Sequence, residues 1–157
     1  MKTIATIEGE RIYERADDTV TWTAKMAIDV DGKGPKYHDP DAQNDTTLHY
    51  KGEPLNADED RYIVVPPIIP QSVEGVVLGC QGMVVNLRTG AMTDCVVGDI
   101  GPHKKLGEAS RAVALALGIN GSPTTGGVDE HIVLYTIKPG LPAVVEGKHY
   151  ELQPYED

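Results

Sequence analysis

Cysteine, basic residues and long apolar runs are all scarce in this chain of 157 residues. Its two cysteines are too few for the disulfide framework of a small secreted domain, and we expect free thiols. No run approaches the ~18 to 20 apolar residues that a membrane-spanning helix needs, so we expect no membrane partner. Internal repeats are also missing, and the length therefore predicts one domain, residues 1–157.

Basic side chains are outnumbered, because 14 Lys and Arg stand against 24 Asp and Glu, for a formal net charge of −10. Binding to nucleic-acid phosphates depends on clustered Lys and Arg, and the chain has no basic stripe, so we expect no nucleic-acid partner. Nine of the acids lie between Asp29 and Asp60, where only three lysines offset them. This distribution favours a cationic partner, although a solvated acidic surface that serves solubility is the alternative.

Sequence motifs for metal, phosphate or serine chemistry are missing as well. The five histidines show no zinc-site spacing, and neither a Gly-x-Ser-x-Gly turn nor a phosphate-binding loop occurs. The acidic turn that starts at Asp29 lacks the ligand set of an EF-hand calcium loop. We therefore expect neither a metal ion nor a cofactor.

Glycine and proline are plentiful, at 17 and 11 residues, and they separate short runs of alternating apolar and polar residues. This pattern predicts a mainly β fold. The predicted strands are 3–7, 11–15, 19–28, 61–65, 76–78, 83–87, 91–97 and 130–138. Residues 29–60 lack periodicity and predict a long structured loop, a kind of segment that often carries function.

One helix is predicted near residue 110. Apolar residues recur there at helical spacing, at positions 109, 112, 113, 116 and 117. We expect Glu108 to open this helix and Gly118 to end it in the left-handed conformation.

Two carboxylates flank the tight loop before this helix. Asp99 follows an apolar strand, and Glu108 comes after eight intervening residues. Glycoside hydrolysis needs a proton donor at the leaving oxygen and a second carboxylate that activates water or attacks carbon, and this pair could supply both. Structural roles are the alternative. Asp99 could accept hydrogen bonds from turn amides, and Glu108 could lie in the first helical turn, where the positive end of the helix dipole stabilises a carboxylate.

The run GDIGPHKKLGEASRAVALALGI, residues 98–119, resembles the catalytic stretch of the fungal-type chitosanases, glycoside hydrolase family 75. Four upstream segments resemble the same family in the same order, and the resemblance spans residues 26–138. These segments are AIDVDGKG at 27–34, DPDAQNDTT at 39–47, LNAD at 55–58 and YIVVP at 62–66.

The resemblance implies endo-hydrolysis of a β-1,4-linked glucosamine polymer with inversion, by an Asp at position 99 and a Glu at position 108. The same run is similar to double-psi β-barrel proteins such as septal lytic transglycosylases, expansins and some cellulases, where Glu108 falls at the position of the catalytic acid. We therefore expect Glu108 to be the general acid and Asp99 the general base. The expected fold is a six-stranded double-psi-type β-barrel with one packed short helix and long loops.

Chitosan carries an ammonium on each deacetylated sugar, so an acidic groove would attract it and select against neutral chitin. Asp29 and Asp31, in an Asp-x-Asp-Gly turn, are expected to bind these amines, although they could instead only satisfy the backbone of their own turn. Asp45, His103 and Tyr37 complete the predicted binding residues.

Two other functions stay open. A peptidoglycan lytic transglycosylase or muramidase would need only Glu108, and a non-catalytic glycan-binding or phage structural domain would need neither acid. An enzyme for this polymer is expected to be secreted or released as a monomer. Because the sequence MKTIATIEGERIYER lacks the apolar core of a signal peptide, a cytoplasmic or phage-encoded protein is the alternative.

Overall fold

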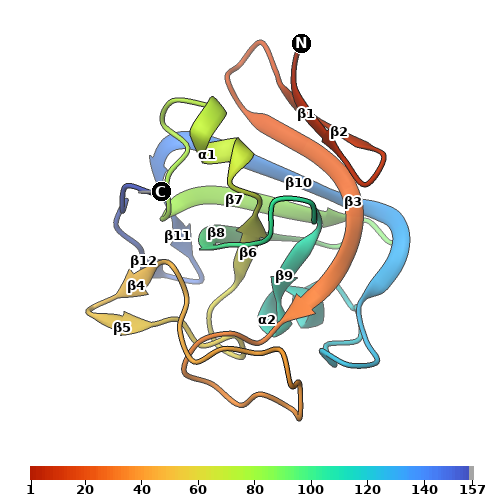
Figure 1. Cartoon of the computed structure of the whole chain (residues 1–157), viewed down its shortest axis with the longest axis vertical. Helices are drawn as coiled ribbons and strands as arrows, with labels where there is room; N and C mark the ends of the chain where they lie inside the picture. Colours follow the sequence, from red (N-terminus) through yellow and green to blue (C-terminus); the bar gives the residue numbers. More distant parts are fainter. Residues whose placement is uncertain (156–157) are drawn as a thin grey trace.

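The protein is described by a computed structural model over residues 1–155, so the last two residues of the predicted domain lie outside the described part. Strands make up 45% of the structure and helices 7%, and six strands close into a barrel (Figure 1), as predicted. No helix among the described residues is long and apolar enough to cross a membrane.

The six barrel strands do not follow one another in chain order. Around the barrel the order is β3 (Val20–Asp29), β10 (Val128–Pro142), β7 (Cys80–Asn86), β8 (Met92–Ile100), β6 (Tyr62–Val65) and β9 (Glu108–Ser110). β9 also pairs with β3, which closes the ring. Two pairings are parallel, β3 with β9 and β6 with β8, and the others are antiparallel. Closure leaves no free sheet edge among these six strands.

Three hairpins and two helices surround the barrel. The strands predicted at 3–7 and 11–15 form the hairpin of β1 (Lys2–Ile7) and β2 (Glu10–Glu14), and this hairpin extends the sheet beside β3 (Figure 1). The acidic segment after β3 holds the small hairpin of β4 (His49–Tyr50) and β5 (Glu53–Pro54). The remaining elements are α1 (Ile68–Ser72), α2 (Arg111–Ala116), β11 (Val144–Val145) and β12 (Lys148–His149).

The barrel interior is a packed apolar core. Along β3, buried residues alternate with more exposed ones, because successive side chains of a strand point to opposite faces. Trp22, Ala24 and Met26 are almost fully buried, and the Trp22 ring stacks on Tyr135 with centroids 5.4 Å apart. Since side chains fill the interior, a ligand has to bind at an end of the barrel rather than inside it.

The predicted start of the helix is wrong. Residues Glu108–Ser110 form β9, and α2 begins only at Arg111, where the Ser110 hydroxyl caps it by accepting from the Val113 amide at 3.4 Å. The predicted end is confirmed, because Gly118 has a φ of +70°. The structure also adds a second short helix, α1, whose Pro70 lies in the first turn, where proline is tolerated.

Two strand predictions also need correction. The last strand does not end at Pro139-Gly140 but continues to Pro142 through a register shift, with Gly140 at a φ of +75°. Residues 76–78 form no named strand and contribute only a bridge from Leu78 to Gln153. Cys80 and Cys95 are buried free thiols, as expected.

Candidate active site

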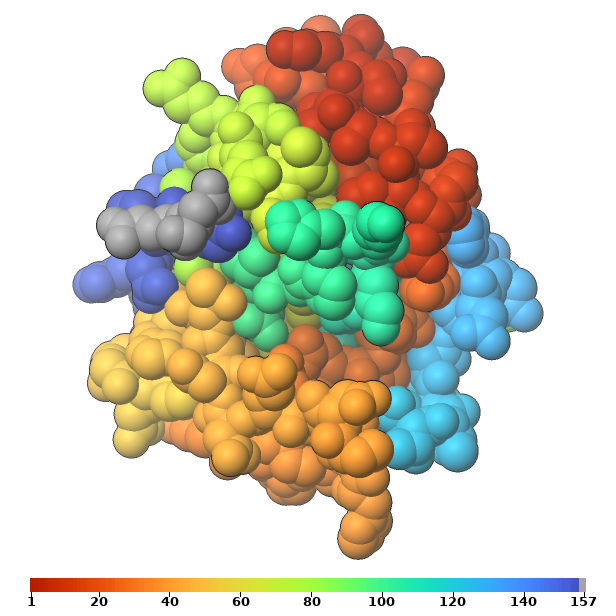
Figure 2. All heavy atoms as spheres, viewed as in Figure 1, coloured from red at the N-terminus to blue at the C-terminus, as the bar shows by residue number. Residues whose placement is uncertain are grey.

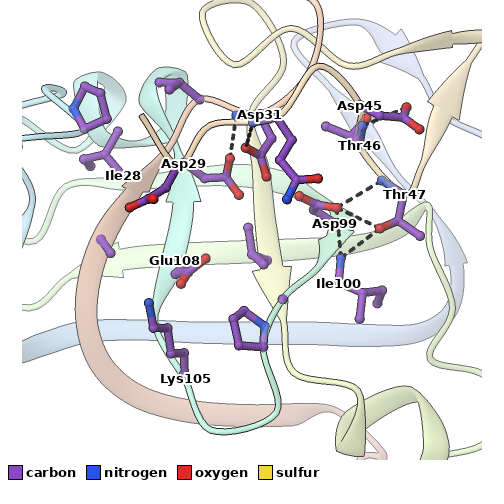
Figure 3. A pocket seen from close by; sticks show the side chains of 18 of the residues that line it. Ile28, Asp29, Asp31, Asp45, Thr46, Thr47, Asp99, Ile100, Lys105 and Glu108 are labelled. Atoms are coloured by element: carbon purple, nitrogen blue, oxygen red, sulfur yellow. Dashed lines mark hydrogen bonds between the residues drawn. The ribbon is translucent and has the colours of Figure 1, made fainter. Parts of the chain in front are cut away.

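A pocket of about 870 Å³ lies at the end of the barrel where β3 and β8 finish. The pocket is also lined by residues of the segment 39–49, by the turn after β8 and by Glu108 of β9 (Figure 3). In the space-filling view the long acidic segment, in orange, borders the teal segment that follows β8 (Figure 2). Five of the seven predicted site residues line the pocket: Asp29, Asp31, Asp45, Asp99 and Glu108.

A β-bulge directs Asp99 into this pocket. Ile63 pairs with Val97 and Val64 with Asp99, so Gly98 is an extra residue in β8. A Cβ at Gly98 would lie 2.6 Å from the Tyr62 Cβ, so glycine is required for this close approach. Bulges of this kind re-aim the next side chain, and Asp99 becomes a buried carboxylate that lines the pocket.

Three donors hold one oxygen of Asp99. Its Oδ1 accepts from the Thr47 amide at 3.0 Å, the Thr47 hydroxyl at 2.7 Å and the Ile100 amide at 3.1 Å (Figure 3). The other oxygen, Oδ2, accepts no hydrogen bond from residues 1–155. The carboxylate is therefore fixed in direction while one oxygen stays available.

The Asp-x-Asp-Gly turn satisfies its own backbone and also points two carboxylates into the pocket. Asp29 Oδ1 accepts from the Asp31 amide at 2.6 Å and from the Tyr62 hydroxyl at 3.2 Å. Asp31 Oδ1 accepts from the Gln43 amide at 2.7 Å, which ties the turn to the acidic segment. Gly32 has a φ of +113°, and a Cβ there would lie 1.9 Å from the Leu55 carbonyl oxygen, so the turn requires glycine.

Asp29, Asp31 and Asp99 form a carboxylate trio. Each offers one oxygen, and the three oxygens lie within 4.8 Å of one another. Burial together with Asp31 and Asp99 raises the pKa of Asp29 to about 8. Burial also raises the pKa of Asp99 to about 6, with Asp31 adding to it and the Thr47 hydrogen bonds opposing it. The trio could hold a cation, whether a substrate ammonium or a metal ion.

Glu108 approaches the pocket from β9, and Figure 3 shows it on the side opposite Asp99. Burial raises the pKa of its carboxyl group, and Lys105 opposes this effect. No donor in residues 1–155 hydrogen-bonds to the Glu108 carboxylate. A desolvated carboxyl without donors favours its protonated form, whereas the donors on Asp99 oppose the effect of its own burial.

Two predicted binding residues lie apart from the others. The Tyr37 hydroxyl donates to Asp58 at 2.6 Å, and its ring lies 4.7 Å from the Arg111 guanidinium. These contacts hold the acidic segment against α2, and Tyr37 does not line the pocket. His103 is exposed in the turn between Asp99 and Glu108, and it does not line the pocket either.

Other pocket residues were not singled out from the sequence. Thr47, which holds Asp99, belongs to the DPDAQNDTT segment, so the resemblance to chitosanases was the available signal. Lys105 lies in the turn before Glu108 and affects its charge state. Asp39 and Asp41 add two more acids to the walls.

Comparison with known proteins does not assign a family. No protein-family model matches the chain, and no curated protein matches it significantly. We therefore derive a function from the geometry of the pocket.

Proposed function

We propose that this chain is an endo-acting chitosanase that hydrolyses β-1,4-linked glucosamine polymer with inversion. Glu108 acts as the general acid and Asp99 as the general base. One observation carries the proposal: two carboxyl groups reach one acidic pocket from different strands, one without hydrogen-bond donors and one held by three.

In the proposed reaction, Glu108 transfers its proton to the glycosidic oxygen as the bond from that oxygen to the anomeric carbon breaks. Asp99 Oδ2 accepts a proton from a water molecule, whose oxygen forms the new bond on the opposite face of the sugar. Oδ2 suits this role because Oδ1 is occupied by Thr47 and Ile100. The products are a new reducing end and a new non-reducing end.

The trio gives the proposed substrate a binding site for its charge. An ammonium beside Asp29 and Asp31 would neutralise Asp31, one of the causes that raise the pKa of Asp99. Substrate binding would thereby favour the ionised form of Asp99 that a general base needs. Neutral chitin lacks this ammonium, so the proposal includes selectivity for deacetylated polymer.

The proposal is tested by incubating the purified protein with chitosan, chitin and peptidoglycan and sizing the products. We expect chitosan to be shortened internally, so that viscosity falls before small oligomers accumulate, with chitin cleaved far more slowly. Glu108→Gln is the matched control for contaminating activity. Release of soluble fragments from peptidoglycan alone would contradict the proposal and favour the transglycosylase or muramidase alternative.

A further inference from the structure

The N-terminal hairpin contacts the segment that separates the two proposed catalytic acids. Glu8, in the turn between β1 and β2, accepts a hydrogen bond at Oε1 from the Leu106 amide at 2.8 Å. Leu106 is 2% exposed and stands two residues before Glu108. In Figure 2 the red hairpin adjoins the teal segment on the visible face. This hairpin lies outside residues 26–138, the part that resembles chitosanases.

Glu8 has a left-handed backbone conformation that is unusual for a glutamate. Glu8 has a φ of +51° and Gly9 a φ of +79°, as in a two-residue hairpin turn with both residues left-handed. Such turns favour Asn-Gly or Asp-Gly, and left-handed backbone is unfavourable for a longer side chain. The contact with Leu106 gives the glutamate a role that the turn itself does not require.

Glu8 also neutralises a cation near Glu108. Its Oε2 accepts from Lys25 Nζ at 3.0 Å, and Lys25 projects from β3, which pairs with β9. Two cations, Lys105 and Lys25, lower the pKa of Glu108, while Asp31 and Glu8 raise it. Asp29 interacts electrostatically with the same carboxyl group. Without Glu8, the unopposed Lys25 ammonium would favour the ionised form of Glu108.

We propose that Glu8 is a positioning residue for the hydrolysis: it anchors the turn before Glu108 through Leu106 and pairs with Lys25, a cation that acts on Glu108. This inference rests on the proposed role of Glu108 as the general acid. It assigns to the N-terminal hairpin a part in the reaction, although the hairpin does not line the pocket.

Variants at Glu8 separate the effect of its hydrogen bond with Leu106 from the effect of its negative charge. Glu8→Gln keeps an acceptor oxygen for the Leu106 amide but removes the negative charge, and Glu8→Ala removes both. Lys25→Met removes the cation. Glu10→Gln is the matched control, because Glu10 lies in the same hairpin but pairs with His131 at 2.7 Å.

The readout is the pH profile of kcat/KM on chitosan oligomers at low salt. For Glu8→Gln we expect the loss of activity with rising pH to move to lower pH, with kcat on the acidic side within about twofold of the original chain. For Glu8→Ala we expect the same shift and a further fall in kcat of about tenfold, because the turn is released. Combining Glu8→Gln with Lys25→Met should return the profile toward that of the original chain, and Glu10→Gln should leave it unchanged.

An NMR titration of the Glu108 carboxyl group tests the inference without a substrate. A lower midpoint in Glu8→Gln, with a changed Leu106 amide resonance in Glu8→Ala, supports the positioning role. If these shifts occur while the original chain does not cleave chitosan, the coupling stands and the proposed substrate is wrong. An unchanged Glu108 midpoint and Leu106 resonance in both variants would overturn the inference and leave Glu8 as a structural anchor of the hairpin.

Discussion

Asp99 and Glu108 are both carboxyl groups in one pocket, and their surroundings assign them different proposed roles. Asp99 is held at one oxygen by Thr47 and Ile100, so its direction is fixed. Glu108 is partly buried, and no residue of the described chain donates to it. At the scale of single residues, the proposed mechanism depends on proton transfer by these two groups.

Replacing either acid with its amide should therefore abolish most activity and preserve the shape of the site. We expect Glu108→Gln and Asp99→Asn each to lower kcat on chitosan by at least ~10²-fold, because each change removes a proton-transfer group. The measurement is steady-state hydrolysis, with thermal unfolding as the check on folding. Activity close to that of the original chain in either variant would remove that residue from the mechanism.

Asp29 should reduce the stability of the folded chain at neutral and alkaline pH. Its pKa is raised from 3.8 to about 8, so between these values the folded chain binds more protons than the unfolded chain. Stability that depends on this bound proton is lost as the pH rises through the folded value. An asparagine at this position needs no proton and can still accept from the Asp31 amide.

We therefore expect Asp29→Asn to unfold at a Tm at least ~3 °C above that of the original chain at pH 8, and at nearly the same Tm at pH 4. Scanning calorimetry at several pH values measures the difference. Asp94→Asn, a change at an exposed acid outside the pocket, is the control. Parallel Tm curves for Asp29→Asn and the original chain would show that Asp29 ionises normally.

At the scale of elements, the C-terminal segment supports the loop that holds Asp99. The Gln153 side-chain amide donates to the Thr47 carbonyl at 2.9 Å, and its oxygen accepts from the His49 amide at 3.3 Å. The backbone amide of Gln153 donates to the Leu78 carbonyl at 2.8 Å, independently of the Gln153 side chain. The side chain thus positions Thr47, which in turn positions Asp99.

Gln153→Ala should lower kcat about 3- to 10-fold with a smaller effect on KM, because a shifted Thr47 would misdirect Asp99. The backbone bridge to Leu78 remains, so we expect the Tm to change by less than ~3 °C. Leu152→Ala, at the neighbouring exposed residue, is the matched control. An equal fall in kcat for both variants would point to general loosening of the segment.

The periodic elements could be predicted from the sequence, and the short ones could not. Ten alternating residues define β3, and the hairpin through Glu8-Gly9 has a local turn signal. β9 has only three residues, and its strand conformation depends on pairing with β3, some 80 positions earlier in the chain. Its apolar Ala109 also fits the helical pattern, which explains why the helix was predicted too early.

The candidate site residues that lie within a recognisable motif could be predicted from the sequence. Asp29, Asp31, Asp45, Asp99 and Glu108 all lie in segments with a family resemblance, and the structure brings them together. Tyr37 was chosen as an aromatic residue in the acidic loop, and its contacts with Asp58 and Arg111 could not be read from sequence. Contacts between distant segments, such as Gln153 with Thr47, leave no periodic or local signal.

At the scale of the whole molecule, the formal net charge of −10 includes an acidic excess around the pocket. Among residues 1–155, the pocket walls carry six aspartates and Glu108 against one lysine, Lys105. A polycation would be drawn to this end of the barrel, and salt would weaken that attraction.

The double variant Asp31→Asn with Asp45→Asn should raise KM on chitosan severalfold at low salt and much less at high salt, because its effect is electrostatic. Asp94→Asn with Asp129→Asn changes the net charge equally at exposed positions outside the pocket and should raise KM far less. Equal effects of the two double variants would mean that overall charge, rather than the pocket, attracts the substrate.

If Glu108 and Asp99 cleave glucosamine polymer by single displacement, as we propose, the configuration of the first products reveals it. Proton NMR spectra recorded during the first minutes of digestion of chitosan oligomers would show it before mutarotation. We expect new reducing ends that are initially α-anomeric, because water attacks opposite the leaving group. Initially β-anomeric ends, or no new reducing ends at all, would contradict it.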